Sequence, residues 1–353
     1  MARGYFRPNV DRMTGYTPGE QPAAGEKVVK LNTNENPYPP SERVISAVRE
    51  VADSRLRLYP DPTARALREA AGRVYDIAPE CVIAGNGSDE LLAMLVRAFC
   101  SEGERVAYPV PTYSLYRTLV RAHGAEAVEV PWADGYCIPE GLAGAGARLV
   151  ILCRPNAPTG TMVPVDAVRE LARSLDCVLC VDEAYVDFAD SEDDNCLPLV
   201  RELENVIVLR TLSKSFSLAG ARVGLGFAPP ALVEGLNKVR DSYNLSRMAL
   251  AAGTAALGDM DWMRTNAQRI RATRSRLVEG LTRLGFECLR SQANFVLARV
   301  GYPRAKELYE MLKARGILVR YFEQEAVRDS VRITVGSDAD IDALLSALGK
   351  IMS

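Results

Sequence analysis

The chain has 353 residues, 48% of them hydrophobic and 25% charged, with a formal net charge of −2. These values are typical of a folded globular protein, and the length favours one large domain with a smaller one. The balanced charge, with no polybasic run, argues against binding to nucleic acid or to anionic lipid. The N-terminal stretch carries charges throughout and no apolar run has the length of a membrane span. We therefore expect a cytoplasmic protein without signal peptide or membrane anchor.

Histidine and cysteine usage excludes several kinds of site. The only histidine is His123, which argues against Ser–His–Asp catalysis and histidine-rich metal sites. Among the eight cysteines, Cys177 and Cys180 have CxxC spacing within an apolar run expected to be a strand, where the two thiols would point to opposite faces. We expect buried core thiols and no metal site, so chemistry must depend on lysine, tyrosine, acids, arginine or a cofactor.

The first 40 residues are rich in proline, glycine and asparagine and predict an arm or lid rather than part of a core. Beyond them, short runs of Val, Ile and Leu alternate with amphipathic stretches. Helices are predicted at 88–103 and 164–175, and buried strands at 148–155, 176–185 and 205–215. This alternation predicts an α/β domain in which a parallel sheet lies between helices.

The C-terminal third has a different pattern. A long helix is predicted at 260–285, followed by the short strands "ANFVLARV" and "SVRITVG" and the helices "PRAKELYEMLKARG" and "DADIDALLSALGKIM". This mixture predicts a smaller α+β domain. We therefore divide the chain into an N-terminal arm (1–40) that packs on the small domain, a large domain (41–255) and the small domain (256–353).

Polar residues follow the predicted strands, where ligands of open α/β sheets gather. In "GNGSDELL" (85–92) a strand turns into a helix with Ser88 as the expected cap, and the free backbone N–H groups suit a phosphate. A capped turn without ligand is the alternative. Tyr113, past the next strand, either stacks on a flat ring or packs in the core. Asn156, in the turn "CRPNAPTG", offers a side-chain donor, although turn chemistry explains most of that segment.

The last two strands end in an acidic group and in a lysine. Asp182 and Tyr185 lie in "CVDEAYVDF", where a buried carboxylate needs a cation, a metal or a protonated ring nitrogen, an ordinary salt bridge being the simplest choice. Lys214 lies among hydroxyl side chains in "RTLSKSFSLAGARVG" and is one of only seven lysines. Arginine replaces lysine in most roles except Schiff-base formation. Together, these strand ends predict a pyridoxal phosphate site.

The chain resembles fold-type-I pyridoxal-phosphate aminotransferases, specifically the histidinol-phosphate aminotransferase group. The motifs "LNTNENPYPP", "RLYPDPTARALREAAG", "GNGSDELL", "PTYSLY", "DEAYVDF", "TLSKSFSLAGARVG" and "VRITVG" occur in family order, nearly end to end. The resemblance implies an aspartate-aminotransferase-like fold, with a mostly parallel sheet sandwiched by helices plus a smaller α+β domain. It also implies a homodimer, pyridoxal 5′-phosphate as cofactor, and amino transfer between L-histidinol phosphate and 2-oxoglutarate in histidine biosynthesis.

The resemblance implies cofactor roles for individual residues. Lys214 matches the lysine that binds the cofactor aldehyde and moves the substrate α-proton. Asp182 matches the acid paired with the pyridine nitrogen, Tyr185 the phenol on the 3′-oxygen, and Tyr113 the ring-stacking residue. The implied phosphate cup consists of Ser88, Asp89, Thr211, Ser213 and Arg222, with Tyr59 reaching in from the other subunit.

The implied substrate ligands are Tyr16, Asn36, Arg320 and Arg332. Arg332 matches an arginine that holds an anionic group, and Arg320 a second arginine that grips the substrate phosphate, with a surface arginine as the alternative. Tyr16 matches an arm tyrosine that closes over the substrate. Glutamate and histidinol phosphate can use the same guanidinium groups, because carboxylate and phosphate both accept paired hydrogen bonds.

One position departs from the family pattern. The family usually has Asn-Pro-Thr-Gly, whereas Ala157 precedes Pro158 here and the asparagine is Asn156. Alanine provides no donor, so we expect Tyr185 to bind the cofactor 3′-oxygen alone or with water. We also expect a higher pKa for the lysine–cofactor linkage than in an Ala157→Asn variant, because a bond to a charged oxygen contributes roughly 1.5–3 kcal/mol.

Three alternatives remain open. Threonine-phosphate decarboxylases and aromatic-amino-acid aminotransferases share the cofactor motifs, and the aromatic substrates carry no phosphate for Arg320. A regulator that has borrowed the fold is a third possibility, usually with an added DNA-binding domain. The motifs begin near residue 31 and end near 336, which leaves little room for such a domain, and Lys214 is intact. We therefore expect an enzyme.

Overall fold

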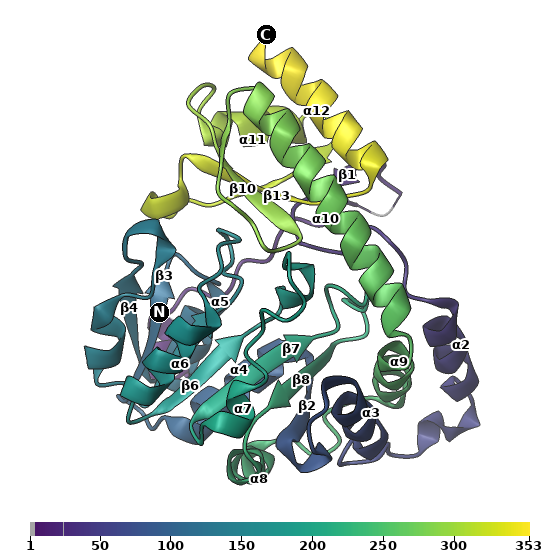
Figure 1. The fold of residues 1–353 in the computed structure, drawn as a ribbon, viewed down its shortest axis with the longest axis vertical. Helices are drawn as coiled ribbons and strands as arrows, with labels where there is room; N and C mark the ends of the chain where they lie inside the picture. Colours follow the sequence, from purple (N-terminus) through teal and green to yellow (C-terminus); the bar gives the residue numbers. More distant parts are fainter. Residues whose placement is uncertain (1–3, 24) are drawn as a thin grey trace.

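The computed structural model describes residues 4–23 and 25–353 and is drawn in Figure 1. Residues 1–3 and 24, which belong to the expected arm, lie outside the described residues. The arm contains a short helix, α1 (Pro8–Arg12), and reaches the first strand, β1 (Val29–Lys30). Within the described ranges, no helix combines the length and the apolar character that crossing a membrane requires.

A seven-stranded sheet forms the centre of the larger part of the molecule. Its order is β2-β8-β7-β6-β5-β3-β4, and all neighbours are parallel except β8, which is antiparallel to both β2 and β7. The strands are β2 (Val82–Asn86), β3 (Arg105–Val110), β4 (Glu126–Pro131), β5 (Leu149–Cys153), β6 (Val178–Asp182), β7 (Val206–Thr211) and β8 (Val223–Phe227). The predicted mostly parallel α/β sheet is thus confirmed.

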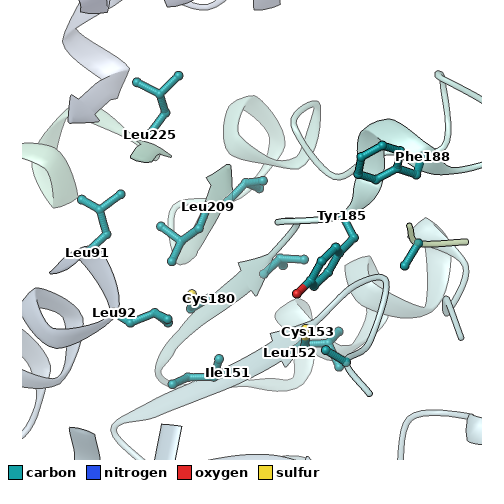
Figure 2. Packing of buried hydrophobic residues seen from close by; sticks show 14 of the residues in the cluster. Leu91, Leu92, Ile151, Leu152, Cys153, Cys180, Tyr185, Phe188, Leu209 and Leu225 are labelled. Carbon is teal, nitrogen blue, oxygen red and sulfur yellow. The ribbon is translucent and has the colours of Figure 1, made fainter. Parts of the chain in front are cut away.

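Helices flank this sheet, because its central strands are apolar on both faces. Every residue of β5 and β7 is buried. Figure 2 shows Leu91 and Leu92 of the covering helix beside Leu209, with Leu225 in the same cluster. The helices of this part are α2 (Glu42–Val51), α3 (Arg65–Tyr75), α4 (Gly87–Phe99), α5 (Leu115–His123), α6 (Val165–Ser174), α7 (Leu199–Glu202), α8 (Pro230–Val239) and α9 (Arg247–Leu257).

The predicted strands are longer than the observed ones, and the difference positions the site. The strand expected at 205–215 ends at Thr211, and the strand expected at 176–185 ends at Asp182. Lys214 and Tyr185 therefore lie in loops beyond the strand ends. Cys180 is a buried residue of β6, whereas Cys177 lies before that strand and is only partly buried, so the two thiols are not a pair within one strand. All eight cysteines are free.

The C-terminal part holds a smaller antiparallel sheet with the order β12-β13-β10-β9. Its elements are α10 (Met260–Arg283), β9 (Glu287–Cys288), β10 (Phe295–Arg299), α11 (Ala305–Lys313), β11 (Ile317–Leu318), β12 (Arg320–Tyr321), β13 (Ser330–Thr334) and α12 (Asp338–Met352). Figure 1 shows α10 running from α9 up to this sheet. The N-terminal strand β1 pairs in parallel with β11, so the later residues of the arm join this part.

Candidate active site

A cavity of about 150 Å³ lies at the carboxyl ends of the central strands. Cys153, Asp182 and Thr211, the last residues of β5, β6 and β7, contribute to its lining. The cavity brings together twelve of the residues that the sequence predicted: Tyr16, Ser88, Asp89, Tyr113, Asp182, Tyr185, Thr211, Ser213, Lys214, Arg222, Arg320 and Arg332. These residues span more than 300 positions of sequence, from Tyr16 to Arg332, and only the fold places them in one site.

The amine of Lys214 is buried, and no carboxylate of residues 4–23 or 25–353 forms an ion pair with it. Its Nζ donates to the carbonyl oxygen of Thr33 at 3.4 Å and lies 5.7 Å from the centre of the Tyr185 ring. Burial, followed by the positive charge of Arg332, lowers the pKa of Lys214 to about 8. A neutral amine is therefore accessible near neutral pH, as a nucleophile toward an aldehyde requires.

Asp182 closes β6 and is almost fully buried. One carboxylate oxygen, Oδ2, accepts from the Tyr116 hydroxyl at 2.7 Å, and Oδ1 accepts from the Ala184 N–H at 3.2 Å. Burial raises the pKa of Asp182 to about 6, and the two hydrogen bonds oppose this rise. A buried carboxylate that lines a cavity suits a protonated ring nitrogen as its partner.

Tyr185 is oriented by Asn34. The Asn34 Nδ2 donates to the Tyr185 hydroxyl oxygen at 3.0 Å, which leaves the phenolic proton free for a group in the cavity. Thr334 Oγ1 donates to Asn34 Oδ1 at 3.1 Å and accepts from the Asn34 N–H at 2.9 Å. Burial raises the pKa of Tyr185, so its hydroxyl stays protonated and can donate.

The start of α4 forms one side of the expected phosphate cup, but not through the expected cap. The helix begins at Gly87, one residue before Ser88, and Asn86 occupies the cap position without a side-chain cap bond. The prediction of Ser88 as cap is therefore wrong, because the turn tightens earlier than the polar residue suggested. Ser88 and Asp89 lie in the first turn and line the cavity, where uncapped N–H groups suit an anion.

Two glycines let the chain pack closely around this helix start. A Cβ on Gly224 of β8 would lie 2.4 Å from the carbonyl carbon of Gly87 and 2.5 Å from the nitrogen of Ser88. A Cβ on Gly87, whose φ is +76°, would lie 2.5 Å from Arg222 Nη2. Only glycine permits both approaches, and together they bring Arg222 to the helix N-terminus.

The remaining donors of the cup are linked to one another. Arg222 Nη1 donates to the Ser213 hydroxyl at 3.3 Å, and Thr211 Oγ1 donates to the same hydroxyl at 3.0 Å. Arg222 Nη2 pairs with Asp89 Oδ2 at 2.9 Å. Two hydroxyls, a guanidinium and a helix start converge here, which is the donor set that a phosphate ester needs.

Tyr113 stands between the arm and the sheet. Its ring contacts the Tyr16 ring edge-to-face at 5.9 Å and the Tyr116 ring at 5.6 Å. The Tyr113 hydroxyl lies 3.5 Å from Asp89 Oδ1. Because Tyr113 lines the same cavity as Lys214 and Asp182, the site fits the pyridoxal ring and phosphate that the sequence resemblance implied.

Two arginines form the opposite side of the cavity. Arg332 donates through Nη2 to the carbonyl of Asn32 at 2.9 Å, while its buried Nε has no partner within the described residues. Burial lowers the pKa of Arg332. Arg320 donates to the carbonyls of Thr17 and Pro18 in the arm, at 3.0 and 3.2 Å. The unpartnered donor and the two nearby charges suit an anionic ligand.

The family comparisons agree with this geometry. The family model for aminotransferase class I and II matches residues 26–348. The chain belongs to the aminotransferase class I and II family. It is 43% identical over 349 residues to histidinol-phosphate aminotransferase 1 of Trichormus variabilis, covering 99% of both chains, and 45% identical to the histidinol-phosphate aminotransferase of Microcystis aeruginosa, covering 97% of each.

Solved structures place the aminotransferase in the expected fold class. The crystal structure of histidinol-phosphate aminotransferase from Sinorhizobium meliloti in complex with pyridoxal-5′-phosphate has a TM-score of 0.91 and 30% identity, covering 99% of this chain and 98% of that one. A Thermus thermophilus aspartate aminotransferase variant has a TM-score of 0.84 at 23% identity, covering 99% and 100%. The predicted aspartate-aminotransferase-like fold is confirmed.

Three predicted site residues of the aminotransferase lie outside the cavity lining. Asn156 is buried and saturated, because Oδ1 accepts from Thr112 at 2.9 Å and Nδ2 donates to Pro111 and Thr159 at 3.0 and 2.8 Å. Ala157 lines the cavity in its place. A direct cofactor bond from Asn156 therefore does not fit this geometry; the side chain secures the turn instead.

The other two residues face the lysine loop and the surface. Asn36 Nδ2 donates to the carbonyls of Lys214 and Ser215, each at 3.1 Å, so it anchors the lysine loop rather than facing the substrate cavity. Tyr59 is 78% exposed and stacks on Tyr243 with ring centres 4.4 Å apart. Tyr59 therefore lies on the surface of the chain and not in its cavity.

Two contributors to the aminotransferase site escaped the sequence analysis. Asn34 lies in "LNTNENPYPP", where its φ of 55° gives a signal only once the backbone is known, since asparagine tolerates the left-handed region. Tyr116 lies in the first turn of α5, three residues after Tyr113, which precedes the helix. The Tyr116 N–H donates to the Tyr113 carbonyl at 3.1 Å, so this turn keeps the two residues close together. Glu183, beside Asp182, makes an ordinary buried salt bridge to Arg154 at 3.2 Å.

Proposed function

We propose that this aminotransferase transfers the amino group between L-histidinol phosphate and 2-oxoglutarate, in histidine biosynthesis, with pyridoxal 5′-phosphate as cofactor. The observation that carries the proposal is the pair Arg320 and Arg332, both lining the cavity that holds Lys214. Two guanidinium groups suit a substrate phosphate and, in the second half of the reaction, a carboxylate. The curated relatives named for this activity, 43–45% identical over nearly the whole chain, support the same substrate.

The cofactor, when bound, supplies an electron sink that lets the α-proton of the amino substrate leave. We assign the chain's own groups as follows. Lys214 Nζ would bind the aldehyde and, once the substrate amine has displaced it, would take and return the α-proton, helped by its lowered pKa. Asp182 would pair with the ring nitrogen, Tyr113 would orient the ring, and Tyr185 would donate to the 3′-oxygen. Thr211, Ser213, Arg222 and the first turn of α4 would hold the phosphate.

The arm and the small sheet hold the substrate in this proposal. Arg332, half-buried in β13, fixes one anionic group through its unpartnered Nε. Arg320, in β12, exchanges its bonds to the arm carbonyls for the substrate phosphate. Tyr16 packs against Tyr113 and excludes water from that side.

A substrate panel tests the proposal. Histidinol phosphate, threonine phosphate, tyrosine and phenylalanine are each supplied with 2-oxoglutarate, and glutamate and CO₂ are scored separately. We expect glutamate to form fastest from histidinol phosphate, with no CO₂. Release of CO₂ from threonine phosphate would assign the decarboxylase activity instead. Equal rates with histidinol phosphate and phenylalanine would favour an aromatic-amino-acid aminotransferase and overturn the proposal.

We also propose a homodimer in which Tyr59 reaches the phosphate of the partner's site. Leu56, Leu58, Tyr59, Tyr243 and Met248 are all large apolar or aromatic residues and are 40–78% exposed. Such side chains close together favour a covered surface, and a second copy of the chain covers it in this proposal.

Mixed dimers test this assembly. Homodimers of the Lys214→Ala variant and of the Tyr59→Phe variant should each be impaired. In a mixed dimer, the Tyr59→Phe subunit keeps its lysine and receives an intact Tyr59 from its partner, so one site of two should recover. Absence of recovery would place Tyr59 outside the partner's site. The control is each variant homodimer alone, taken through the same mixing procedure.

The division into arm (1–40), large domain (41–255) and small domain (256–353) remains our proposal for the domain organisation, as does a cytoplasmic location. The arm contacts the proposed large domain as well as the proposed small domain. Arg7 donates to the carbonyl of Ala122, the last residue but one of α5, at 2.6 Å, and Glu20 pairs with Lys313 of α11 at 2.9 Å. These contacts support an arm that spans the two domains.

A further inference from the structure

Tyr116 lies beneath the cavity and has no assigned role. It is fully buried on α5, and its ring is fixed edge-to-face between Tyr108 and Tyr113, at 5.8 and 5.6 Å between centres. Its hydroxyl donates to Asp182 Oδ2 at 2.7 Å. Packing on two sides therefore aims one phenolic donor at the carboxylate that faces the cofactor ring.

Most of the surroundings of Asp182 disfavour its ionised form, so the hydrogen bond from Tyr116 matters for its charge. Burial, the neighbouring charge of Asp89 on α4 and that of Glu183 after β6 all raise the pKa of Asp182. The Tyr116 hydroxyl and the Ala184 N–H lower it, and no lysine or arginine of the described chain makes an ion pair with it. The four cations that line the cavity, Lys214, Arg222, Arg320 and Arg332, make their hydrogen bonds or ion pairs with other groups.

The neighbouring thiols add no stabilisation. Cys153 at the end of β5 and Cys180 in β6 are buried, and burial raises the pKa of both, so they remain neutral. Burial also raises the pKa of Tyr116 well above its usual value, so its hydroxyl remains a donor at all working pH values. Among the residues that the structure describes, Tyr116 is thus the one side chain that donates a hydrogen bond to the Asp182 carboxylate.

We propose that Tyr116 is a positioning residue that acts through Asp182: its hydrogen bond keeps the carboxylate ionised and weakly basic, so that the proton shared with the cofactor's ring nitrogen stays on the nitrogen. The inference rests on the proposed function, because it assumes the pyridoxal ring in this cavity. A more basic Asp182 would take that proton. The ring would then accept less well the electron pair that stays on the substrate α-carbon when the α-proton leaves.

The test compares Tyr116→Phe with Tyr108→Phe in the full-length holoenzyme. Both variants remove one hydroxyl from a buried tyrosine of the same aromatic row, but the Tyr108 hydroxyl faces Glu129 at 3.1 Å and not Asp182. The cofactor is labelled with ¹⁵N in its ring. In the Tyr116→Phe variant the ring-nitrogen resonance should move toward the value of an unprotonated nitrogen, while in the wild type and in Tyr108→Phe the ring nitrogen should stay protonated. The kcat should fall about tenfold with KM nearly unchanged, the result expected for a change of about one pKa unit.

A second readout does not require the cofactor. In the cofactor-free full-length chain with ¹³C-labelled aspartate, Tyr116→Phe should raise the pKa of Asp182 by about one unit, because a hydrogen bond to the charged form is lost. An unchanged ring-nitrogen resonance together with an unchanged Asp182 pKa would overturn the proposal and leave Tyr116 as packing only. Failure of the wild type to use histidinol phosphate would overturn the proposed substrate but leave both measurements valid.

Discussion

The two walls of the cavity are built in different ways. The cofactor wall, meaning Asp182, Tyr185, Thr211, Ser213, Lys214 and Arg222, stands at buried strand ends and is held by side chains, such as Tyr116 and Asn34. The substrate wall, meaning Tyr16, Arg320 and Arg332, comes from the arm and the small sheet, and its arginines donate mainly to backbone carbonyls.

In the proposed function, the cofactor wall carries out the chemistry and the substrate wall determines which substrate binds. The cofactor wall sits on the rigid sheet, where a small displacement would disturb proton transfer. The substrate wall rests on an arm with few buried side chains, so its contacts can be exchanged for those of a ligand. We therefore expect substitutions in the cofactor wall to abolish activity toward all substrates alike. Substitutions in the substrate wall should instead change which substrate is preferred.

The largest effect is expected for Lys214→Ala. The variant should lose more than about 10⁴-fold in transfer from every amino substrate, because proton transfer alone contributes about 10²–10⁴-fold and the nucleophile is lost as well. Borohydride should no longer trap cofactor on the protein. Lys238→Ala, which removes an exposed lysine paired only with Glu234 at 3.7 Å, is the control. Retained trapping in Lys214→Ala would assign the covalent link to another lysine.

Asp182 should limit the stability of the cofactor-free protein. Its pKa is about 6 when folded against an ordinary value of 3.8, so the folded state binds more protons between these values and stability falls as the pH rises from about 4 to 6. The free energy of unfolding decreases by up to about 3 kcal/mol, and the decrease is complete above pH 6. In the Asp182→Asn variant, the free energy of unfolding measured by urea titration at fixed protein concentration should no longer decrease over this pH range.

The exposed residue Asp193 provides the matched control for this measurement. Asp193→Asn should keep the wild-type fall between pH 4 and 6. If Asp182→Asn shows the same fall as well, burial of Asp182 is not its source. Bound cofactor that pairs with the Asp182 carboxylate should reduce this decrease in the free energy of unfolding of the wild type. Such a reduction would distinguish a carboxylate that binds a ligand from one with a structural role only.

The cofactor wall was largely predictable from the sequence, because its residues are polar groups set directly after apolar strands. Lys214, Asp182 and Thr211 stand out for that reason. Tyr116 and Asn34 did not, since each acts on a residue at least 66 positions away, and only the fold brings them together. Gly224 is similar: its need for glycine comes from the backbone of Gly87.

The wrong or displaced predictions share a local cause. Ser88 was expected to cap α4 and Asn156 to face the cofactor, yet the helix begins at Gly87 and the Asn156 amide turns into its own loop. Side-chain direction in a turn depends on a rotation of one residue, which composition does not reveal. The expected fold needed less detail, because continuous apolar strands alternating with helices admit few arrangements.

A smaller effect is expected at the substrate wall. Arg320→Gln should raise the KM for histidinol phosphate about 10- to 100-fold, because one or more hydrogen bonds to a charged group are lost. The kcat should change only a few-fold. The KM for phenylalanine, which has no phosphate, should change less. Arg315→Gln removes another small-domain arginine that donates only to a backbone carbonyl, that of Met311 at 2.9 Å, and should leave both values unchanged. Equal effects on the two substrates would place Arg320 outside the phosphate site.

The smallest effect is expected at Ala157, which lines the cavity beside the cofactor wall at the position where the family resemblance implied an asparagine donor. Asn34 already orients the Tyr185 hydroxyl, so the proton of Tyr185 remains available for the 3′-oxygen without help from residue 157. Adding a second donor with Ala157→Asn should lower the pKa of the lysine–cofactor linkage by about one unit, because the deprotonated form gains a hydrogen bond to its charged oxygen. Ala157→Leu has nearly the same size and no donor, so it separates hydrogen bonding from bulk. The pKa of the lysine–cofactor linkage is measured by absorbance titration. The same pKa in the Ala157→Asn and Ala157→Leu variants would show that Tyr185 alone determines the charge on this oxygen.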